Sequence, residues 1–412
     1  MPGQSPATLI ERTLRQLALS RHWPILAATA VLVAIGVVTI HADDPAAGRK
    51  QLVFLGIAAA CLAAFQAVDY RIIGKYAGTF YVLAAGLIAY TVLGSIVTVP
   101  GVVARNAAYN WIAFGPLALQ PSELMKVAFV MVMARYLRFR SNYRTLGGLV
   151  APFLLAALPM LLILKQPDLG TALVFIPTLF AMLYVAGAKR RHLAAVVLAA
   201  AVAMPFLWMS GQHWIRHADG ATRTLCGSCS NVPGLNLLPQ FVKHYQRERL
   251  FDLFTDDLDL SDSTLQIRKA MTAQGSGGFF GNGVGDIRFG QTVPEGRNDM
   301  IFALIGEQFG FVGSTLVIAM YLVIFVTGLW IAGGTREPFG RLVAIGIVVM
   351  LAGQMCINLM VVMKLMPVTG VTLPFVSSGG SSLIASFMSI GLLLNVGQRR
   401  PIVMARESFD YE

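Results

Sequence analysis

The sequence predicts an all-α polytopic integral membrane protein with ten transmembrane helices and a large extracytoplasmic loop between helices 7 and 8. Composition is the first observation behind this prediction: 56% of the 412 residues are apolar and 13% are charged, against about 25% charged in soluble domains. The second is the recurrence of apolar runs that can cross a bilayer, which takes about 17 to 25 residues. The runs lie at 24–41, 51–68, 76–99, 122–137, 148–164, 170–187, 192–210, 301–333, 340–363 and 380–396.

These runs divide the chain into five segments. The N-terminal segment, 1–22, is polar and basic and precedes a run that is long enough to be a true span, so no cleavable signal is expected. Residues 23–210 hold helices 1 to 7, residues 211–300 form the outer loop, residues 301–398 hold helices 8 to 10, and residues 399–412 form a tail. The spans are expected to be helical because lipid cannot satisfy the polar groups of an irregular backbone.

Lysine and arginine predict the orientation, because they gather in cytoplasmic loops. With the N-terminus inside, the inner segments carry 17 of the 32 basic residues, and long loops such as 211–300 count little in this comparison. Both termini are therefore expected to be cytoplasmic. The net charge of +11 then reflects topology and attraction to anionic lipid headgroups, so membrane lipids and not nucleic acid are the expected partners.

Four polar clusters fall at the predicted outer face. The first runs from Asn110-Trp111 to the string Gln120-Pro-Ser-Glu123 and on to Lys126. Glu123 and Lys126, three residues apart, share a face of the predicted helix. Either they neutralise each other as an ion pair, or they mark a site, because charges inside a membrane are costly and usually functional. Both interpretations stay open from the residues alone.

The second and third clusters are turns between predicted spans. In the second, 165–171, Asp168 either caps the following helix, which is favoured, or takes part in a site. The third, 367–382, contains Pro367 and Pro374 and is expected to be a re-entrant loop buried in protein. Its serines, Ser378 among them, suit close packing of helices by small residues, and a structural role is favoured for them.

The fourth cluster is the segment 211–300, which holds about half of the carboxylates. It contains Arg247 and Arg249 in a basic stretch, and then a glycine-rich string at 275–285 that would let backbone N–H groups approach an anion. Its end carries Glu295 and Asp299. A carboxylate at the membrane boundary beside basic groups suits a general base, and the alternative is capping of the next helix.

The cysteines predict no metal centre. Cys61 and Cys356 fall in spans, whereas Cys226 and Cys229 form a Cys-x-x-Cys in the outer loop. No second pair or nearby histidine pattern completes a tetrahedral zinc site. In an oxidising compartment the pair is either a local disulfide or two free thiols, and both remain open.

Together the four clusters resemble the SEDS family (shape, elongation, division and sporulation), whose members include RodA and FtsW. The similarity extends from the first span to Arg400. The matching strings are Gln120-Pro-Ser-Glu123, Gln166-Pro-Asp-Leu-Gly170, Tyr245-Gln-Arg247, Gly275-Ser-Gly-Gly278, Pro294-Glu295 with Asp299, and Leu373-Pro-Phe with Ser378-Gly-Gly-Ser-Ser382. The resemblance implies a peptidoglycan glycosyltransferase that polymerises lipid II into glycan strands at the outer face of the bacterial cytoplasmic membrane, beside a class B penicillin-binding protein that makes the crosslinks.

The resemblance also implies roles for individual residues. Asp299 matches the family's catalytic aspartate and would take the proton of the attacking hydroxyl. The departing pyrophosphate would be stabilised by cationic groups or by a divalent cation, Mg²⁺ or Mn²⁺, held by one or two carboxylates. The residues expected at the substrate site are Glu123, Lys126, Asp168, Arg247, Arg249, Glu295 and Ser378.

Some positions depart from the family pattern. The arginine usual before the tryptophan that matches Trp111 is replaced by Asn110, and Ser378 stands where an aromatic ring is usual. Thr369 before Gly370 favours the elongation branch, RodA, slightly over the division branch. The rival functions are a flippase that transports lipid II and a non-catalytic scaffold for a penicillin-binding protein.

Overall fold

A computed structural model describes residues 22–95, 97, 99–105, 108–114, 117–209, 214–216, 222–224 and 262–399. Within these ranges each predicted apolar run coincides with a helix. The helices are α2 (Trp23–Asp43), α3 (Pro45–Ala67), α5 (Ala77–Leu93), α6 (Pro121–Phe139), α7 (Val150–Lys165), α8 (Leu169–Ala186), α9 (Arg190–Met209), α12 (Ile301–Gly334), α13 (Pro338–Val362) and α14 (Gly380–Gln398).

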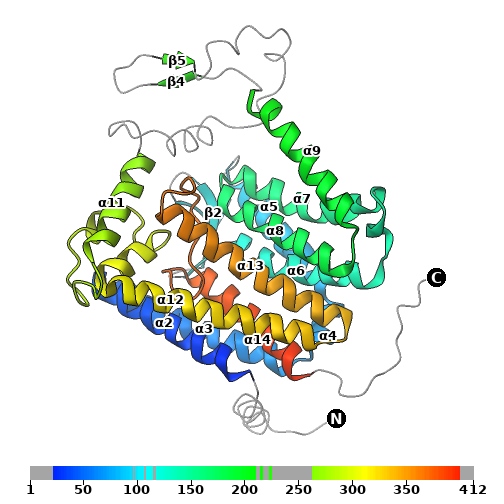
Figure 1. Cartoon of the computed structure of the whole chain (residues 1–412), viewed down its shortest axis with the longest axis horizontal. Coiled ribbons are helices and arrows are strands. Elements are labelled where there is room, and N and C mark those ends of the chain that lie inside the picture. The colour runs from blue at the N-terminus through cyan, green and yellow to red at the C-terminus, as the bar shows by residue number, and fades with distance from the viewer. Residues whose placement is uncertain are drawn as a thin grey trace.

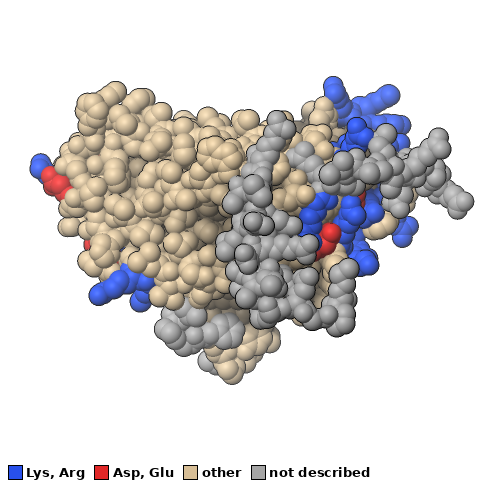
Figure 2. All heavy atoms as spheres, turned by 90° about the horizontal axis from the view of Figure 1, so that it is seen from below, with Lys and Arg blue, Asp and Glu red and all other residues tan. Residues whose placement is uncertain are grey.

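Seven helices of the described ranges are long and apolar enough to cross a membrane, so the chain is a multi-pass membrane protein. α5 is shorter, with 17 residues, and α6 and α9 are not among the seven. The count of ten spans therefore stays a prediction for those three. Figure 2 shows a broad surface without Lys, Arg, Asp or Glu, with a large group of basic side chains at the right end and fewer charged side chains at the left end.

Helix α14 lies at the centre of the bundle. It packs most extensively on α3 and also contacts α6, α12 and α13, and nearly all of its side chains are buried. The other main pairs are α12 with α2, α12 with α13, α13 with α8, and α5 with α6. The helices run roughly between one end of the molecule, where α11 (Asp262–Ser276) lies, and the other, where the short helix α4 (Tyr70–Lys75) lies (Figure 1).

Helix α12 is broken near its start. Gly310 has φ 65° and ψ −157°, a conformation that glycine adopts without a steric penalty. The glycine-rich string packs into this break: the N–H groups of Asn282 and Gly283 donate to the carbonyls of Glu307 and Gln308. These two N–H groups bind the part of α12 that precedes the break, so they are used within the protein and not by an anion.

The connection between α5 and α6 contains a small sheet, which the all-α prediction missed. Its strands, β1 (Val102–Arg105), β2 (Ala108–Phe114) and β3 (Leu117–Leu119), are antiparallel in the order β1-β2-β3. Trp111 pairs with Val103, and Ala113 pairs with Ala118. A second hairpin joins β4 (Trp214–Arg216) and β5 (Thr222–Thr224), and short 3₁₀ helices lie at Asn142–Arg144, Gly147–Leu149 and Gly290–Thr292.

The connection between α13 and α14 is irregular and buried, as expected for a loop enclosed in protein. Leu373, Phe375 and Val376 are almost fully buried in it. The hydroxyl of Tyr321 on α12 donates to the carbonyl of Pro374, and the side-chain amide of Gln51 on α3 donates to the carbonyl of Ser377 (3.1 Å). The loop is thus anchored from two helices, which places its residues at one end of the bundle.

Candidate active site at one end of the helix bundle

A cavity of about 620 Å³ lies at the end of the bundle where α6 and α8 begin and where α13 ends. Its wall contains residues from all four predicted clusters. They are Asn110, Trp111, Ala118 and Gln120 from the first; Pro167 and Asp168 from the second; Val368, Thr369, Gly370, Thr372, Ser378, Gly379, Gly380 and Ser382 from the third; and Gln266, Glu295, Asn298 and Asp299 from the fourth. Segments separated by more than a hundred residues therefore share one polar cavity.

Asp299 lies on this wall at the end of a tight turn. Glu295, with φ 52°, begins the turn, and its carbonyl accepts the N–H groups of Asn298, Asp299 and Met300. Helix α12 starts directly afterwards, at Ile301, so Asp299 is half-buried at a rigid helix entrance. The carboxylate faces the loop between α13 and α14: a Cβ atom placed on Gly370 would lie 3.6 Å from Oδ2 of Asp299.

Hydrogen bonds to backbone carbonyls join this turn to the loop. The side-chain amide of Asn358 on α13 donates to the carbonyls of both Asp299 and Val371 (2.7 Å each). The hydroxyl of Ser377 donates to the carbonyl of Asn298 (2.6 Å), and the N–H of Ser378 donates to the carbonyl of Arg297 (2.9 Å). The serines thus have structural contacts, while Ser378 also lines the cavity.

An ion-pair network attaches the same turn to the corner between α2 and α3. Nε of Arg297 lies 2.7 Å from Oδ2 of Asp43, and Nη1 lies 2.5 Å from Oδ2 of Asp44. Asp44 also caps α3 by accepting the N–H groups of Ala46 and Ala47. Two backbone N–H groups and then Arg297 hold the pKa of Asp44 below its usual value. This network was not predicted from the sequence, because it joins residues far apart in the chain.

Asp168 caps a helix and also lines the cavity. Its Oδ1 accepts the N–H of Thr171 (3.0 Å) and caps α8, while its Oδ2 accepts the side-chain amide of Gln120 (3.2 Å) and the residue lines the cavity. Burial raises the pKa of this carboxyl above its usual value of 3.8, and the hydrogen bonds from Thr171 and the charge of Lys126 act in the opposite direction. Asp168 therefore ties the first and second clusters together.

Glu123 and Lys126 form an ion pair within α6, with Nζ 2.7 Å from Oε1. Both are almost fully buried, at 4% and 3% exposure, and neither is part of the cavity wall. Their charges act on Asp168. The two residues thus form the ion pair that was one of the two interpretations for them.

A different cation lines the cavity. Lys50, on the first half of α3, is exposed and belongs to the wall, although no role was predicted for it from the sequence. Its position close to the predicted start of the second span is the only signal that could have identified it. Arg247 and Arg249, which were expected at the site, lie outside the described residues, as do Cys226 and Cys229.

Two polar atoms of the wall have no hydrogen-bond partner among the described parts of the protein. They are Oδ1 of Asn110, on β2, and Oγ1 of Thr369, in the loop before α14. A buried polar atom without a partner costs free energy, so these two atoms are suited to bind a polar ligand. Trp111 beside Asn110 adds an aromatic side chain to the wall.

Glu307, in contrast, has a structural role. It is fully buried in α12, and its two carboxylate oxygens accept the N–H groups of Arg288, Phe289 and Gly290 at 2.7–2.8 Å. Within the described ranges no group of three or more His, Cys, Asp or Glu side chains could hold a metal ion.

Comparison with known protein families gives a match over almost the whole chain. The family of cell cycle proteins that comprises FtsW, RodA and SpoVE matches residues 13–401. Stage V sporulation protein E of Bacillus subtilis is 32% identical over 385 residues, which cover 90% of this chain and 95% of that protein. The probable peptidoglycan glycosyltransferase FtsW of Geobacter metallireducens is 31% identical, with 85% and 84% covered. The peptidoglycan glycosyltransferase RodA of Treponema pallidum is 30% identical, with 72% and 78% covered.

Solved structures agree with this result. A chain of a peptidoglycan synthase complex, described as coordinating polymerization and crosslinking, superimposes with a TM-score of 0.72 at 28% identity, with 91% of this chain and 97% of that chain covered. The rod shape determining protein RodA of Thermus thermophilus gives a TM-score of 0.62 at 27% identity, with 92% and 97% covered. Relatives named for sporulation, division and elongation all match, so the slight preference for the RodA branch stays a prediction.

Proposed function

This chain belongs to the FtsW, RodA and SpoVE family, and we propose that it polymerises lipid II into glycan strands at the cavity lined by Asp299. It is a peptidoglycan glycosyltransferase that serves cell elongation or division, and its relatives FtsW and RodA are named as peptidoglycan glycosyltransferases. The observation that carries the assignment of the site is the convergence of all four polar clusters on one cavity, with an aspartate held at a helix entrance on its wall. Such a cavity suits a reaction between two polar headgroups.

The reaction joins the 4-hydroxyl of one disaccharide to the anomeric carbon of another. A C–O bond forms at the anomeric carbon, the bond to the polyprenyl pyrophosphate breaks, and the hydroxyl proton passes to a base. Asp299 is the proposed base, since its backbone is fixed on both sides and its carboxylate lies on the wall. The attacking oxygen would become more nucleophilic as the proton moves to this carboxylate.

The leaving pyrophosphate gains negative charge and needs cationic stabilisation. Lys50 is the described cation on the cavity wall, and we assign it this role. Asp299 and Glu295 are carboxylates of the same wall that a Mg²⁺ or Mn²⁺ ion carried by the pyrophosphate would meet. Such an ion would supply further neutralisation of the leaving group.

The remaining residues of the wall would bind the sugars. Oδ1 of Asn110 and Oγ1 of Thr369 are available to hydroxyl or amide groups of the substrate. Asp168, fixed by Gln120 and Thr171, would support the cavity near the buried pair Glu123 and Lys126. Glu295 and Ser378 complete the proposed substrate-binding set among the described residues.

The proposed location is the outer face of the bacterial cytoplasmic membrane, with both termini in the cytoplasm. The excess of Lys and Arg in the predicted inner loops supports this orientation. A class B penicillin-binding protein is the proposed partner, because a chain of similar fold occurs in a peptidoglycan synthase complex that coordinates polymerization and crosslinking. The partner would crosslink the strands that this chain makes.

The decisive experiment supplies lipid II to the purified protein with its penicillin-binding protein and measures glycan polymer. Asp299→Ala should lower the rate by about 10²- to 10⁴-fold, which is the usual contribution of a general base. The matched control is Asp286→Ala, because Asp286 is an outer carboxylate that pairs with Arg288 and does not line the cavity. Equal rates for the Asp299 variant and the wild type would overturn the assigned base.

The same preparation distinguishes the rival functions. A transporter would move labelled lipid II across vesicle membranes and make no polymer under any condition. A scaffold would neither polymerise nor transport lipid II, and its presence would change only the crosslinking rate of the partner.

A further inference from the structure

A second cavity lies at the opposite end of the bundle from Asp299. Helix α6 begins with Pro121 near the cavity lined by Asp299 and ends with Phe139, which lines the second cavity. Its 19 residues span about 28 Å at 1.5 Å per residue, which is close to the thickness of a bilayer core. Helix α13 connects the same two ends in the opposite direction, from Phe339 towards Asn358. The second cavity therefore lies near the other membrane interface.

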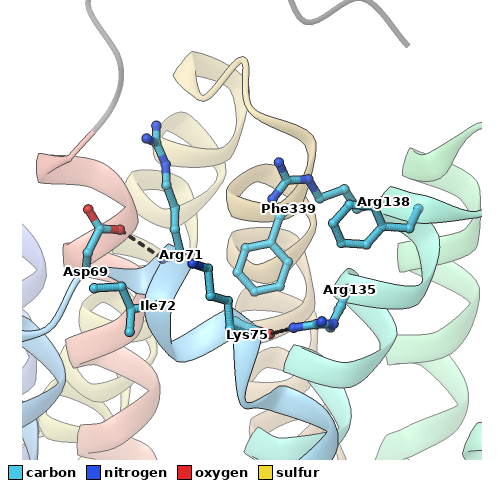
Figure 3. Close-up of a pocket in the computed structure, with 9 residues that line it drawn as sticks. Asp69, Arg71, Ile72, Lys75, Arg135, Arg138 and Phe339 are labelled. Atoms are coloured by element: carbon cyan, nitrogen blue, oxygen red, sulfur yellow. Dashed lines mark hydrogen bonds between the residues drawn. The ribbon is translucent and has the colours of Figure 1, made fainter. Parts of the chain in front are cut away.

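This basic pocket, as we call it, has a volume of about 700 Å³. Four cationic side chains line it, Arg71 and Lys75 from α4 and Arg135 and Arg138 from the end of α6, against the single carboxylate of Asp69. Figure 3 shows these side chains around the ring of Phe339. The pocket thus has a strong excess of positive charge in a concave, partly apolar setting.

Much of the hydrogen-bonding capacity of these cations is unused. Arg138 is paired with Glu337 (3.1 Å), whereas Arg135 makes one hydrogen bond to the described residues, from Nη1 to the carbonyl of Gly74 (2.7 Å). Arg71 uses Nε in a bond to the hydroxyl of Tyr70 (3.4 Å). Lys75 is exposed and has no partner within the described ranges. A guanidinium carries five donors whose planar arrangement matches the oxygens of a phosphate.

Apolar side chains adjoin the cations. Phe339 is buried and stacks on Tyr70, with ring centroids 6.2 Å apart, which forms a firm wall. Ile72 and Phe139 line the rim and are exposed, at 48% and 66%. Cations beside exposed apolar groups at a membrane interface match a lipid, whose charged headgroup and acyl chains are joined in one molecule.

We propose that the basic pocket binds the phosphate of an anionic phospholipid headgroup, whose acyl chains lie along Ile72 and Phe139. Arg135 and Arg71 contact the phosphate oxygens, and Lys75 adds a mobile charge at the entrance. The occupant would connect α4, α6 and α13, which meet at this pocket. The same oxygens occur in free phosphate, but only a lipid would also use the apolar rim.

The test titrates the purified full-length protein in detergent with phosphatidylglycerol and counts bound lipids by native mass spectrometry. Arg71→Gln with Lys75→Gln should weaken binding by about tenfold or more, as expected when two charged contacts to phosphate are removed. Both side chains are exposed, so folding should be unaffected. The matched control is Lys189→Gln with Arg191→Gln, which removes the same charge from exposed residues next to the inner end of α8, outside the pocket.

Three outcomes would overturn the proposal. One is equal weakening by the pocket and control variants, which would indicate attraction by surface charge alone. Another is equal binding of phosphatidylcholine, whose headgroup carries no net charge. The third is displacement of the lipid by excess glycerol phosphate or inorganic phosphate, which would make the pocket a site for the free anion. Preference for phosphatidylglycerol, lost in the pocket variant and resistant to both soluble anions, would support it.

Discussion

The side-chain amide of Asn358 donates a hydrogen bond of 2.7 Å to the backbone carbonyl of Asp299. The same nitrogen donates to the carbonyl of Val371 (2.7 Å), so one buried side chain holds the proposed base against the loop opposite it. The carboxylate itself is left free of this contact. Asn358 is therefore a positioning residue and not a catalytic one.

We expect Asn358→Ala to lower both stability and activity. Two carbonyls lose their donor, which costs about 1–3 kcal/mol for a buried group, and the turn at Asp299 is released. The matched control is Asn395→Ala, because Asn395 is equally buried and its amide donates hydrogen bonds to two carbonyls, those of Phe65 and Val68, at the far end of the bundle.

Thermal unfolding and the initial rate of polymerisation check this prediction. Both variants should unfold at lower temperature, but only the Asn358 variant should lose turnover per folded molecule. If the two variants lost turnover equally, Asn358 would have no special relation to the site. The KM for lipid II should change less than kcat, since the backbone of the base and not the substrate contacts is disturbed.

Arg297 is expected to matter more for activity than for stability. Its partners Asp43 and Asp44 lie at a partly exposed corner, with the arginine side chain 41% exposed, and exposed ion pairs contribute about 0–1 kcal/mol. However, Arg297 lies two residues before Asp299, and its carbonyl accepts the N–H of Ser378. Arg297→Ala should therefore slow polymerisation several-fold with little change in unfolding temperature.

A double-mutant cycle with Asp44→Asn measures the coupling. Asparagine can still cap α3, so this change removes the charge and keeps the cap. If the network positions the turn, the double variant should be no slower than Arg297→Ala alone. Fully additive losses in rate would show that the two residues act independently.

The helices could be predicted well, because a bilayer-crossing run is a local property of the sequence. Each predicted run coincides with a helix from α2 to α14. The sheet β1–β3 was missed, since its strands have three to seven residues and are defined by pairing with one another. The break at Gly310 was also missed, because an isolated glycine in an apolar run becomes a break only through packing of the string at 277–283.

The site could be predicted in part. Asp168, Glu295, Asp299 and Ser378 all line the cavity, since the turns between predicted spans place polar residues at the same end. Lys50 and the contacts of Arg297 and Asn358 were not foreseen. They depend on which helices are neighbours, and hydropathy carries no information about that. For the same reason the sequence could not show that Glu123 and Lys126 lie behind the cavity wall and do not line it.

The role of Lys50 can be tested against that of its neighbour Arg49. Lys50 and Arg49 are consecutive exposed cations on α3, and consecutive residues of a helix point about 100° apart; only Lys50 lines the cavity. Lys50→Gln should lower kcat/KM about tenfold or more, because a hydrogen bond to a charged group contributes about 1.5–3 kcal/mol. Arg49→Gln should leave it nearly unchanged.

Polymerisation assays at several lipid II concentrations check this pair, with Lys50→Arg as the variant that keeps the charge. Partial recovery by arginine is expected if the cation stabilises pyrophosphate. Equal losses for Lys50→Gln and Arg49→Gln would instead indicate general attraction of the substrate by charge, and would contradict the assigned role.

The pH dependence of stability should reveal the raised pKa of Asp168. Burial raises the pKa of this carboxyl above 3.8, so between pH 3.8 and the raised pKa the folded state binds more protons than the unfolded state. Stability contributed by Asp168 is therefore lost as the pH rises through this window. Asp168→Asn can keep the cap on Thr171 without the charge, and its stability relative to the wild type should increase as the pH rises.

Asp44→Asn is the control, because the pKa of Asp44 is shifted in the opposite direction to that of Asp168. The pKa of Asp44 is lowered by the N–H groups of Ala46 and Ala47 and by Arg297, so its contribution is present above pH 3.8 and is lost as the pH falls through the lowered pKa. The asparagine variant should be less stable than the wild type near neutral pH, and the difference should disappear in acid. Thermal unfolding in detergent across acidic and neutral pH measures both variants. If both differences followed pH in the same direction, Asp168 would not be held in a desolvated position, and its proposed part in shaping the cavity would be wrong.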